Sequence, residues 1–318
     1  MRAIAVDKFK GEPRLVEVAQ PAPKPEQLLV KIAATALNPF DWKVADGIME
    51  GAMPAVFPLI LGQDAAGTVS AVGSNVTRFK TGDRIFGQFF HSPVGEGTFA
   101  EYAVVPQKAA LALLPREIDF PTAAALPTAG MTALAMLEAL ELEAGSRVLI
   151  VGATGGVGSF ATQLAANEGL RVLATAAPSD GERLRSLGAS EIYASRDEAL
   201  VSDVRGNHPQ QIDGVIDLVS NAAGLTALAG LVRQGGCVLT TVFSADEKTL
   251  HARGLRGGNF EVRASSSLLE RLVDIVKSGK LAVPIDSTIS LSETPAAIVR
   301  SRAGHSKGKT VIVPAASD

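Results

Sequence analysis

The sequence predicts an α/β protein in which an irregular, turn-rich β half precedes a doubly wound parallel sheet. Residues 1–115 alternate short apolar runs with Gly- and Pro-containing turns, which is typical of an irregular barrel or sandwich. From residue 147 onward, apolar strands alternate with helical segments, which is typical of a parallel sheet. The length of 318 residues suits two domains, at roughly 150 residues each.

The first half is expected to be built mainly from strands. Turns such as Pro21–Pro25 and Gly82-Asp83 separate the apolar or alternating runs. The expected strands are Ala3–Val6, Leu15–Val18, Leu28–Ala36, Gly67–Val72, Arg84–Phe86 and Phe99–Val105. Residues Asn38–Gly47 interrupt this pattern and are expected to form a loop that enters a short helix.

In the second half of the chain, the spacing of apolar residues changes to one that includes helices. Met131, Leu134 and Leu137 are spaced three apart, which predicts a helix over Thr128–Leu142. The strands expected after it are Arg147–Val151, Arg171–Ala176, Glu191–Tyr193, Gly214–Val219 and Cys237–Val242. The helices expected in this half are Val157–Glu168, Asp180–Leu187 and Leu268–Lys277, and the strand Thr310–Val313 closes the chain.

Composition excludes several classes of protein. Thirty Lys and Arg against 33 Asp and Glu give a net charge of −3, which argues against a nucleic-acid partner. The single cysteine, Cys237, cannot form an internal disulfide and is expected in the core. Two uncharged stretches, Phe120–Leu137 and Val148–Asn167, contain too many Pro, Gly and hydroxyl residues for a membrane span. We therefore expect a soluble, cytoplasmic protein with no membrane partner.

One glycine-rich turn carries the strongest chemical signal. The run Gly152-Ala153-Thr154-Gly155-Gly156-Val157-Gly158 follows an apolar strand and opens a helix. It departs from G-x-G-x-x-G only at Ala153, which replaces the first glycine. A bare backbone at a helix N-terminus suits a pyrophosphate, so the turn predicts a dinucleotide site. The alternative is a purely structural turn.

The tip of the next strand bears on the choice of dinucleotide. It reads Thr175-Ala176-Ala177-Pro178-Ser179 and lacks the carboxylate that would bind a ribose 2′-hydroxyl. Small residues leave room for a 2′-phosphate, which Arg183, or alternatively Arg185, could pair. Asp180 could approach a ribose, although it is more simply read as a helix cap. This pattern favours NADP(H) over NAD(H).

Taken together, five segments resemble the medium-chain dehydrogenase/reductase superfamily, and most closely its zinc-independent NADPH:quinone oxidoreductase branch. The resemblance covers essentially the whole chain. The five segments are Asn38–Lys43, Leu61–Val69, Leu126–Ala133, Gly152–Gly158 and His305–Val311. The resemblance implies a chaperonin-10-like β-barrel domain at 1–115, to which residues 266–318 return. A Rossmann domain would occupy residues 116–265.

The resemblance also implies that no metal is bound. Gln63-Asp64 stands where zinc-dependent relatives carry a His-Glu pair, and Asn38 lies near the position of their cysteine. The four histidines and Cys237 are scattered, with no pair at the spacing of zinc ligands. His91 lies in a Gly- and Pro-containing loop and is expected to be solvated.

Site residues follow from the same resemblance. Asn38 would face the nicotinamide end of the site and hydrogen-bond a substrate carbonyl or the ribose. Asp41 and Lys43 are catalytic candidates in the same loop, with a structural ion pair or a solvated charge as the alternative. Trp42 would line the substrate pocket or belong to the core. The other cofactor contacts would be Thr128, Thr154, Gly155, Gly156, Val157, Val219 and Phe243.

The implied function is NADPH-dependent reduction of quinones by direct hydride transfer, with no metal. A reductase of the carbon–carbon double bond in enals, enones or enoyl thioesters is the alternative within enzymes. A protein that binds NADP(H) without efficient turnover is the alternative outside them. The expected partners are a small quinone or conjugated carbonyl substrate and, by resemblance, a second copy in a homodimer.

Overall fold

The computed structural model describes residues 1–194, 197–304 and 307–314. The chain forms two compact units. The first comprises Met1–Ala129, Ala264–Lys277 and Val283–Asp318, and the second comprises Gly130–Arg263 and Ser278–Ala282.

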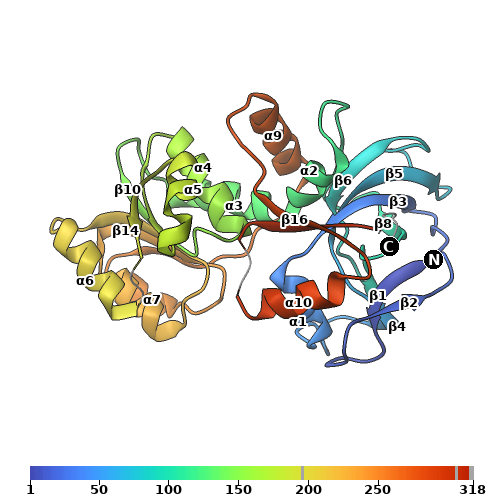
Figure 1. The fold of residues 1–318 in the computed structure, drawn as a ribbon, viewed down its shortest axis with the longest axis horizontal. Coiled ribbons are helices and arrows are strands. Elements are labelled where there is room, and N and C mark those ends of the chain that lie inside the picture. Colours follow the sequence, from blue (N-terminus) through green and yellow to red (C-terminus); the bar gives the residue numbers. More distant parts are fainter. Residues whose placement is uncertain (195–196, 305–306, 315–318) are drawn as a thin grey trace. The chain divides into compact units, whose positions relative to one another are not determined.

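Two sheets form the frame of the first unit (Figure 1). A seven-stranded sheet has the order β16-β17-β3-β5-β6-β9, with β8 paired to β3, and a four-stranded sheet has the order β2-β1-β4-β7. The bounds are β1 Arg2–Val6, β2 Arg14–Glu17, β3 Gln27–Ala36, β4 Ala55–Ile60, β5 Asp64–Val72, β6 Arg84–Gln88, β7 Val94–Glu96, β8 Tyr102–Pro106, β9 Leu111–Leu113, β16 Ile285–Ser290 and β17 Lys309–Val313.

The C-terminal strand β17 completes the larger sheet of this unit. It runs antiparallel to β3, with Val311 opposite Ala36 and Ile312 opposite Thr35. On its other side β3 pairs with β5, so that Ala36 also faces Asp64. The end of β3 and the starts of β5 and β17 therefore meet, although the sequence separates them widely.

Apolar side chains bury both sides of this frame. Leu28, Val30 and Ile32 of β3 belong to one core cluster, together with Ile85 and Phe89. A second cluster contains, among others, Ile4, Leu37, Leu61, Phe99 and Ile312. β3 reads as an almost continuous apolar run because residues pack against both of its faces.

Short helices follow the strands of the first unit. α1 covers Pro39–Ala45 and α2 covers Phe120–Ala125, while α9 spans Ser266–Lys277 and α10 spans Thr294–Arg302. α2 packs on β3 and β5, and the Asp119 carboxylate caps it by accepting from the Thr122 N–H at 2.7 Å. α3, Pro127–Leu140, leads into the second unit.

The second unit confirms the predicted doubly wound parallel sheet. Its six parallel strands have the order β12-β11-β10-β13-β14-β15, which is the 3-2-1-4-5-6 order of dinucleotide-binding folds. The strands are β10 Arg147–Val151, β11 Arg171–Thr175, β12 Ala189–Tyr193, β13 Ile212–Asp217, β14 Val232–Thr240 and β15 Arg256–Asn259.

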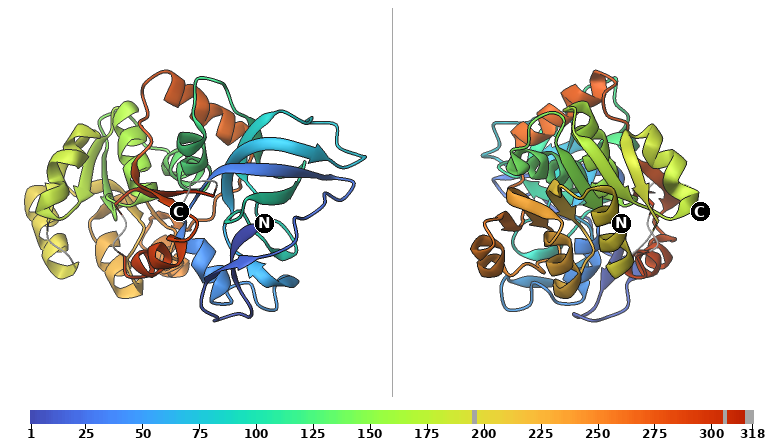
Figure 2. Two further views of the ribbon diagram at one scale, coloured as in Figure 1. Left: turned by 45° about the vertical axis from the view of Figure 1, so that its right-hand side comes forward. Right: turned by 90° about the vertical axis from the view of Figure 1, so that its left-hand side faces the viewer.

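Helices cover both faces of this sheet, α4 and α5 on one and α6 and α7 on the other (Figures 1 and 2). Their bounds are α4 Gly156–Asn167, α5 Gly181–Ser186, α6 Asp197–Asn207, α7 Ala222–Ala229 and α8 Glu247–Ala252. Of these, α6, α7 and α8 were not predicted. Within the three described ranges, no helix is long and apolar enough to cross a membrane.

Candidate active site

Asn38 lies between the end of β3 and the start of α1. Its φ of −125° and ψ of 152° are extended, and Pro39 fits the first helical position. The Asn38 backbone N–H donates to Oδ2 of Asp41 at 2.7 Å. Because the Asn38 side chain makes no capping hydrogen bond to the helix, it is available to other groups.

The Asn38 side chain joins two charged residues that the sequence did not single out as site residues. Nδ2 donates to Oδ2 of Asp64 at 2.9 Å and to the Ala36 carbonyl at 3.3 Å. Oδ1 accepts a hydrogen bond of 2.6 Å from Nζ of Lys309, which also donates to the Leu37 carbonyl at 3.1 Å. None of Asn38, Asp64 and Lys309 is more than 3% exposed. Both amide hydrogens of Asn38 are thus engaged inside the protein.

Thr128 also forms hydrogen bonds with the Asp64 carboxylate. Its hydroxyl donates to Oδ1 of Asp64 at 2.6 Å, and its backbone N–H donates to Oδ2 at 3.0 Å. The same hydroxyl accepts from Nε2 of Gln63 at 3.1 Å and from Nε2 of Gln88 at 3.0 Å. One donor and two lone pairs are the full capacity of a hydroxyl, so Thr128 orders these three side chains. We call Asn38, Asp41, Asp64, Thr128 and Lys309 the buried polar cluster.

Burial and neighbouring charges shift the pKa values of the three ionisable residues in the cluster. Burial raises the pKa of Asp41 well above its ordinary value, and the charge of Asp64 adds to the rise. Burial also raises the pKa of Asp64, and Lys309 and the hydrogen bonds from Thr128 partly offset this rise. Burial lowers the pKa of Lys309, and the two carboxylates oppose this. Asp64 accepts three hydrogen bonds from Asn38 and Thr128, and such bonds favour the ionised carboxylate, so its pKa is raised less than that of Asp41.

The third catalytic candidate, Lys43, lies elsewhere on α1. Its Nζ lies 5.8 Å from the centroid of the Trp42 ring. Trp42 packs against the core cluster of this unit, and its Nε1 donates to Oγ of Ser301 at 3.1 Å. The structure thus brings Asn38 and Asp41 together, with Lys309 as their cation, and places Lys43 beside Trp42.

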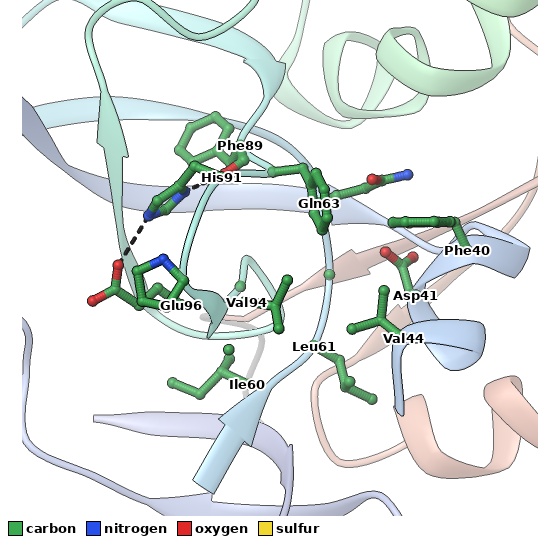
Figure 3. A pocket seen from close by; sticks show the side chains of 15 residues that line it. Phe40, Asp41, Val44, Ile60, Leu61, Gln63, Phe89, His91, Val94 and Glu96 are labelled. Atoms are coloured by element: carbon green, nitrogen blue, oxygen red, sulfur yellow. Dashed lines mark hydrogen bonds and ion pairs between the residues drawn. The ribbon is translucent and has the colours of Figure 1, made fainter. Parts of the chain in front are cut away.

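A pocket of about 30 Å³ adjoins the buried polar cluster (Figure 3). Asp41, a member of the cluster, lines this pocket, and so does Gln63, whose Nε2 donates to Thr128. Phe40 and Phe90 form part of its apolar wall, with their ring centroids 5.2 Å apart in an edge-to-face arrangement. The pocket therefore combines aromatic surface with the carboxyl group of Asp41, whose pKa is raised by burial.

His91 also lines the pocket, and the prediction that it is solvated is wrong. Its side chain is 9% exposed. Nδ1 lies 2.7 Å from the Phe89 carbonyl oxygen, and Nε2 lies 2.9 Å from Oε2 of Glu96 (Figure 3). The loop folds inward because both ring nitrogens find partners there, which its Gly and Pro content does not reveal.

In the second unit, the glycine-rich turn has the backbone that a bound diphosphate needs. Gly152 has a φ of +88°, which glycine adopts without strain. A Cβ at Gly158 would lie 2.6 Å from Cα of Ala153, so glycine also allows α4 to approach the turn closely. The Gly152 N–H donates to Oγ1 of Thr175 at 3.0 Å and ties the turn to β11. The predicted pyrophosphate contacts, Thr154, Gly155, Gly156 and Val157, form the turn and the start of α4.

Arg183 reaches this turn. Its Nη2 donates to the Thr154 carbonyl at 3.2 Å, whereas Arg185 is exposed. Asp180 occupies the N-cap position of α5 but makes no capping hydrogen bond, so its interpretation as a helix cap is wrong. Oγ of Ser179 lies 3.4 Å from its Oδ2 instead. Arg183 thus contacts the same turn that the Gly152 N–H ties to Thr175 at the end of β11.

Two large apolar side chains stand exposed beyond the carboxyl ends of the central strands. Val219 follows β13 and is 65% exposed, and Phe243 follows β14 and is 62% exposed. Phe243 also has a φ of +58°, which is rare for a bulky residue. Ligands of doubly wound sheets bind outside the carboxyl ends of the strands, so both side chains lie where a ligand could cover them.

The side chains that could ligate a metal are dispersed. Within residues 1–194, 197–304 and 307–314, no group of three or more His, Cys, Asp or Glu is placed to hold a metal ion. Cys237 is 1% exposed, and burial raises the pKa of its thiol, as expected for a core residue. His305, which belongs to the family-like tail, lies outside the described residues.

Sequence reasoning missed Asp64, Lys309 and Glu96 as site residues. Lys309 opens the strand Lys309–Val313 and Asp64 opens β5, which otherwise begins with Ala and Gly. A charged residue at the first position of a buried strand is a signal that could have found both. Glu96 gave no comparable signal.

Comparisons with known proteins agree with this architecture. The family model described as "Alcohol dehydrogenase GroES-like domain" matches residues 24–116, and that described as "Zinc-binding dehydrogenase" matches residues 187–312. The chloroplast envelope quinone oxidoreductase homolog of Arabidopsis thaliana is 33% identical over 94% of this chain and 93% of that protein. The NADPH-dependent alkenal/one oxidoreductase of the same plant is 32% identical over 97% of this chain and 77% of that protein.

Solved structures show the same fold. The quinone oxidoreductase of Coxiella burnetii superimposes with a TM-score of 0.85 at 28% identity, covering 99% of both chains. An alcohol dehydrogenase superfamily protein of Novosphingobium aromaticivorans gives 0.83 at 32% identity, again covering 99% of both chains.

Proposed function

This chain belongs to the medium-chain dehydrogenase/reductase superfamily, within its quinone oxidoreductase branch, and we propose that it reduces quinones with NADPH and without a metal. The observation that carries the proposal is the pairing of the buried polar cluster with the phenylalanine-lined pocket. An aromatic wall suits a planar quinone, and the Asp41 carboxyl group lines the same pocket.

Lys309 supports the metal-free part of the proposal. Its ammonium lies 2.6 Å from Oδ1 of Asn38 and supplies the positive charge that compensates Asp64. A divalent cation beside Asn38 would meet this ammonium at close range and would be repelled. The amides of Asn38 and Gln63 are also poor substitutes for the thiolate and imidazole ligands that zinc prefers.

The second unit fits an NADP(H) cofactor on its own geometry. When bound, the nicotinamide supplies the hydride. The N–H groups of Thr154, Gly155, Gly156 and Val157 would hold the pyrophosphate at the start of α4. Val219 and Phe243 would be covered at the edge of the nucleotide.

The 2′-phosphate would lie at the tip of β11. Thr175, Ala176 and Ser179 present no carboxylate there, and Arg183 already contacts the turn. An arginine pairs a phosphate through several N–H donors. This arrangement favours NADPH, and the name of the Arabidopsis alkenal/one oxidoreductase points the same way.

Within the first unit we assign different roles to the candidate residues. Asn38 acts as a positioning residue, because its amide hydrogens bind Asp64 and the Ala36 carbonyl. Asp41 joins the cluster to the wall of the pocket, and burial raises its pKa. We assign the cationic role to Lys309 in place of Lys43.

A reductase of enals or enones is the second candidate function. Two relatives carry such names, the alkenal/one oxidoreductase and the 2-methylene-furan-3-one reductase of Solanum lycopersicum, which is 33% identical over 98% of this chain. A conjugated carbonyl needs the same hydride and the same proton, so the described site suits both substrate classes.

Steady-state oxidation of NADPH against a panel of quinones, enals and saturated ketones tests the proposal. We expect turnover with quinones, weaker turnover with enals and no change after treatment with a chelator. Activity confined to enals would favour the second candidate, and NADPH binding without turnover on any substrate would favour a non-catalytic binding protein. Activity that disappears with chelator and returns with zinc would contradict the metal-free mechanism. The homodimer and the cytoplasmic location stay predictions.

A further inference from the structure

His91 and Glu96 form a second ionisable group at the pocket, separate from the buried polar cluster. His91 comes just after β6, and Glu96 is the last residue of β7. Their side chains are 9% and 24% exposed, and both line the pocket, with Asp41 on a different part of its wall (Figure 3). Asp41, His91 and Glu96 are the ionisable residues among the described ones that line it.

The hydrogen bonds of His91 fix how many protons the pair carries. A carbonyl oxygen only accepts, so Nδ1 must bear the hydrogen in its 2.7 Å contact with the Phe89 oxygen. The 2.9 Å contact between Nε2 and Oε2 of Glu96 then needs a second hydrogen. Either Nε2–H donates to a carboxylate, or a carboxylic acid donates to Nε2. In both forms the pair holds one proton more than a neutral imidazole beside a carboxylate.

The pocket that His91 and Glu96 line is small. The pocket volume of about 30 Å³ admits about two or three groups of the size of a water molecule, at roughly 10–15 Å³ each. A carbonyl oxygen fits into such a space, whereas the aromatic ring that carries it does not. A carbonyl oxygen in this pocket would therefore lie among residues that include His91 and Glu96.

We propose that the His91–Glu96 pair is the acid that protonates the substrate oxygen when a quinone or conjugated carbonyl is reduced. This rests on the proposed function. The hydride brings two electrons and one hydrogen to the substrate, and the pair supplies the remaining proton to the oxygen, giving a hydroquinone or an enol. The pair is left as a neutral imidazole facing a carboxylate and regains its proton from water.

A matched control lies in the second unit. His208 and Glu191 form another His–Glu pair, with Nε2 3.0 Å from Oε2, and neither residue lines the pocket. Replacing Glu96 by Gln preserves the shape and a hydrogen-bonding group at position 96 but removes the extra proton. Glu191→Gln makes the same chemical change at a residue that does not line the pocket.

The experiment combines kinetics with nitrogen-15 NMR of the histidine rings. We expect Glu96→Gln to lower kcat for a quinone about 100-fold, with the Kd for NADPH within twofold of wild type. Glu191→Gln should leave kcat unchanged. In wild type without ligand, both ring nitrogens of His91 should report an attached or shared proton, and Nε2 should lose it in Glu96→Gln. Wild-type turnover should show a normal solvent deuterium isotope effect.

Two results would overturn the assignment: an unprotonated Nε2 in wild-type His91, or equal kcat values for Glu96→Gln and wild type. If Glu96→Gln does not fold, the protonation of the wild-type His91 ring nitrogens, measured by NMR, and the solvent isotope effect on wild-type turnover still test the proposal. If wild type reduces no quinone or enone, the proposed function fails instead, and the NMR result shows independently whether the pair holds the proton.

Discussion

The two functional regions of this chain are assembled in different ways. The turn in the second unit is one continuous stretch, Gly152–Gly158, and it acts through its backbone. The buried polar cluster takes Asn38, Asp64, Thr128 and Lys309 from four separate parts of the chain and acts through side chains. Substitutions near the turn should therefore change ligand affinity, whereas substitutions in the cluster should change stability first.

Lys309→Met should have the largest effect. It removes the one cation of the cluster and leaves the buried Asp64 uncompensated, which should cost about 3–5 kcal/mol of unfolding free energy. Urea denaturation at neutral pH measures this. The control, Lys43→Met, removes a lysine that lies over Trp42 and should change stability by only about 0.5 kcal/mol. A loss below about 1 kcal/mol for Lys309→Met would show that the cluster does not depend on its ammonium.

Arg183→Ala should have the next largest effect, on affinity and not on stability. Loss of a charge-assisted pair with the 2′-phosphate should weaken NADPH binding by about 1.5–3 kcal/mol, or roughly 10- to 150-fold, with little change for NADH. Calorimetric titration measures both ligands, and Arg185→Ala serves as the exposed control. Ala176→Asp should invert the preference, because a carboxylate repels the phosphate. Equal binding of NADH and NADPH by wild type would instead make Asp180 the candidate ribose ligand.

Asp41→Asn should have the smallest effect, visible in the pH dependence of stability. Because the folded pKa of Asp41 lies above its ordinary value of 3.8, the folded chain keeps a proton that the unfolded chain releases. The contribution of Asp41 to stability is therefore full below pH 3.8 and falls as pH rises toward the folded pKa. Asparagine cannot lose that proton, so the variant should lose less stability, by on the order of 1 kcal/mol, over this window.

Thermal unfolding between about pH 4 and pH 8 measures the difference. Asp64 contributes a change of the same sign, and Lys309, whose pKa is lowered, contributes one of opposite sign. Both remain in the variant, but Asp41 interacts electrostatically with each of them, so the difference between the curves reports Asp41 together with these interactions. Asp46→Asn, at the end of the same helix, is the exposed control. Parallel curves for wild type and Asp41→Asn would mean that Asp41 is ionised in the folded protein.

Local patterns explain which elements could be predicted. An apolar run, a glycine-rich turn and a change in the spacing of apolar residues predict the strand before Gly152 and the helix after it. β15 was missed because its sequence, Arg256-Gly-Gly-Asn259, has no strand propensity. It forms because Cys237–Thr240 offers a parallel partner. In α6, Leu200 and Val204 are buried core residues four apart, which is too weak a pattern to predict a helix.

The residues of the candidate site also fall into two groups, those that a local motif predicts and those that only the fold brings together. Asn38 and Asp41 could be predicted because one short motif contains them both. Lys309 becomes their partner only through the pairing of β17 with β3, which no local pattern encodes. The orientation of His91 likewise depends on the Phe89 carbonyl and on Glu96, which the folded loop brings to its ring.

Single-turnover reduction of a quinone, followed by stopped flow with NADPH deuterated at the transferred position of C4, tests the central claim most directly. Direct hydride transfer in a metal-free site predicts a slower transfer with deuterium than with hydrogen, and the same two rates in the presence of a chelator. Identical rates for the two isotopes, or transfer that stops with chelator and resumes with zinc, would contradict it.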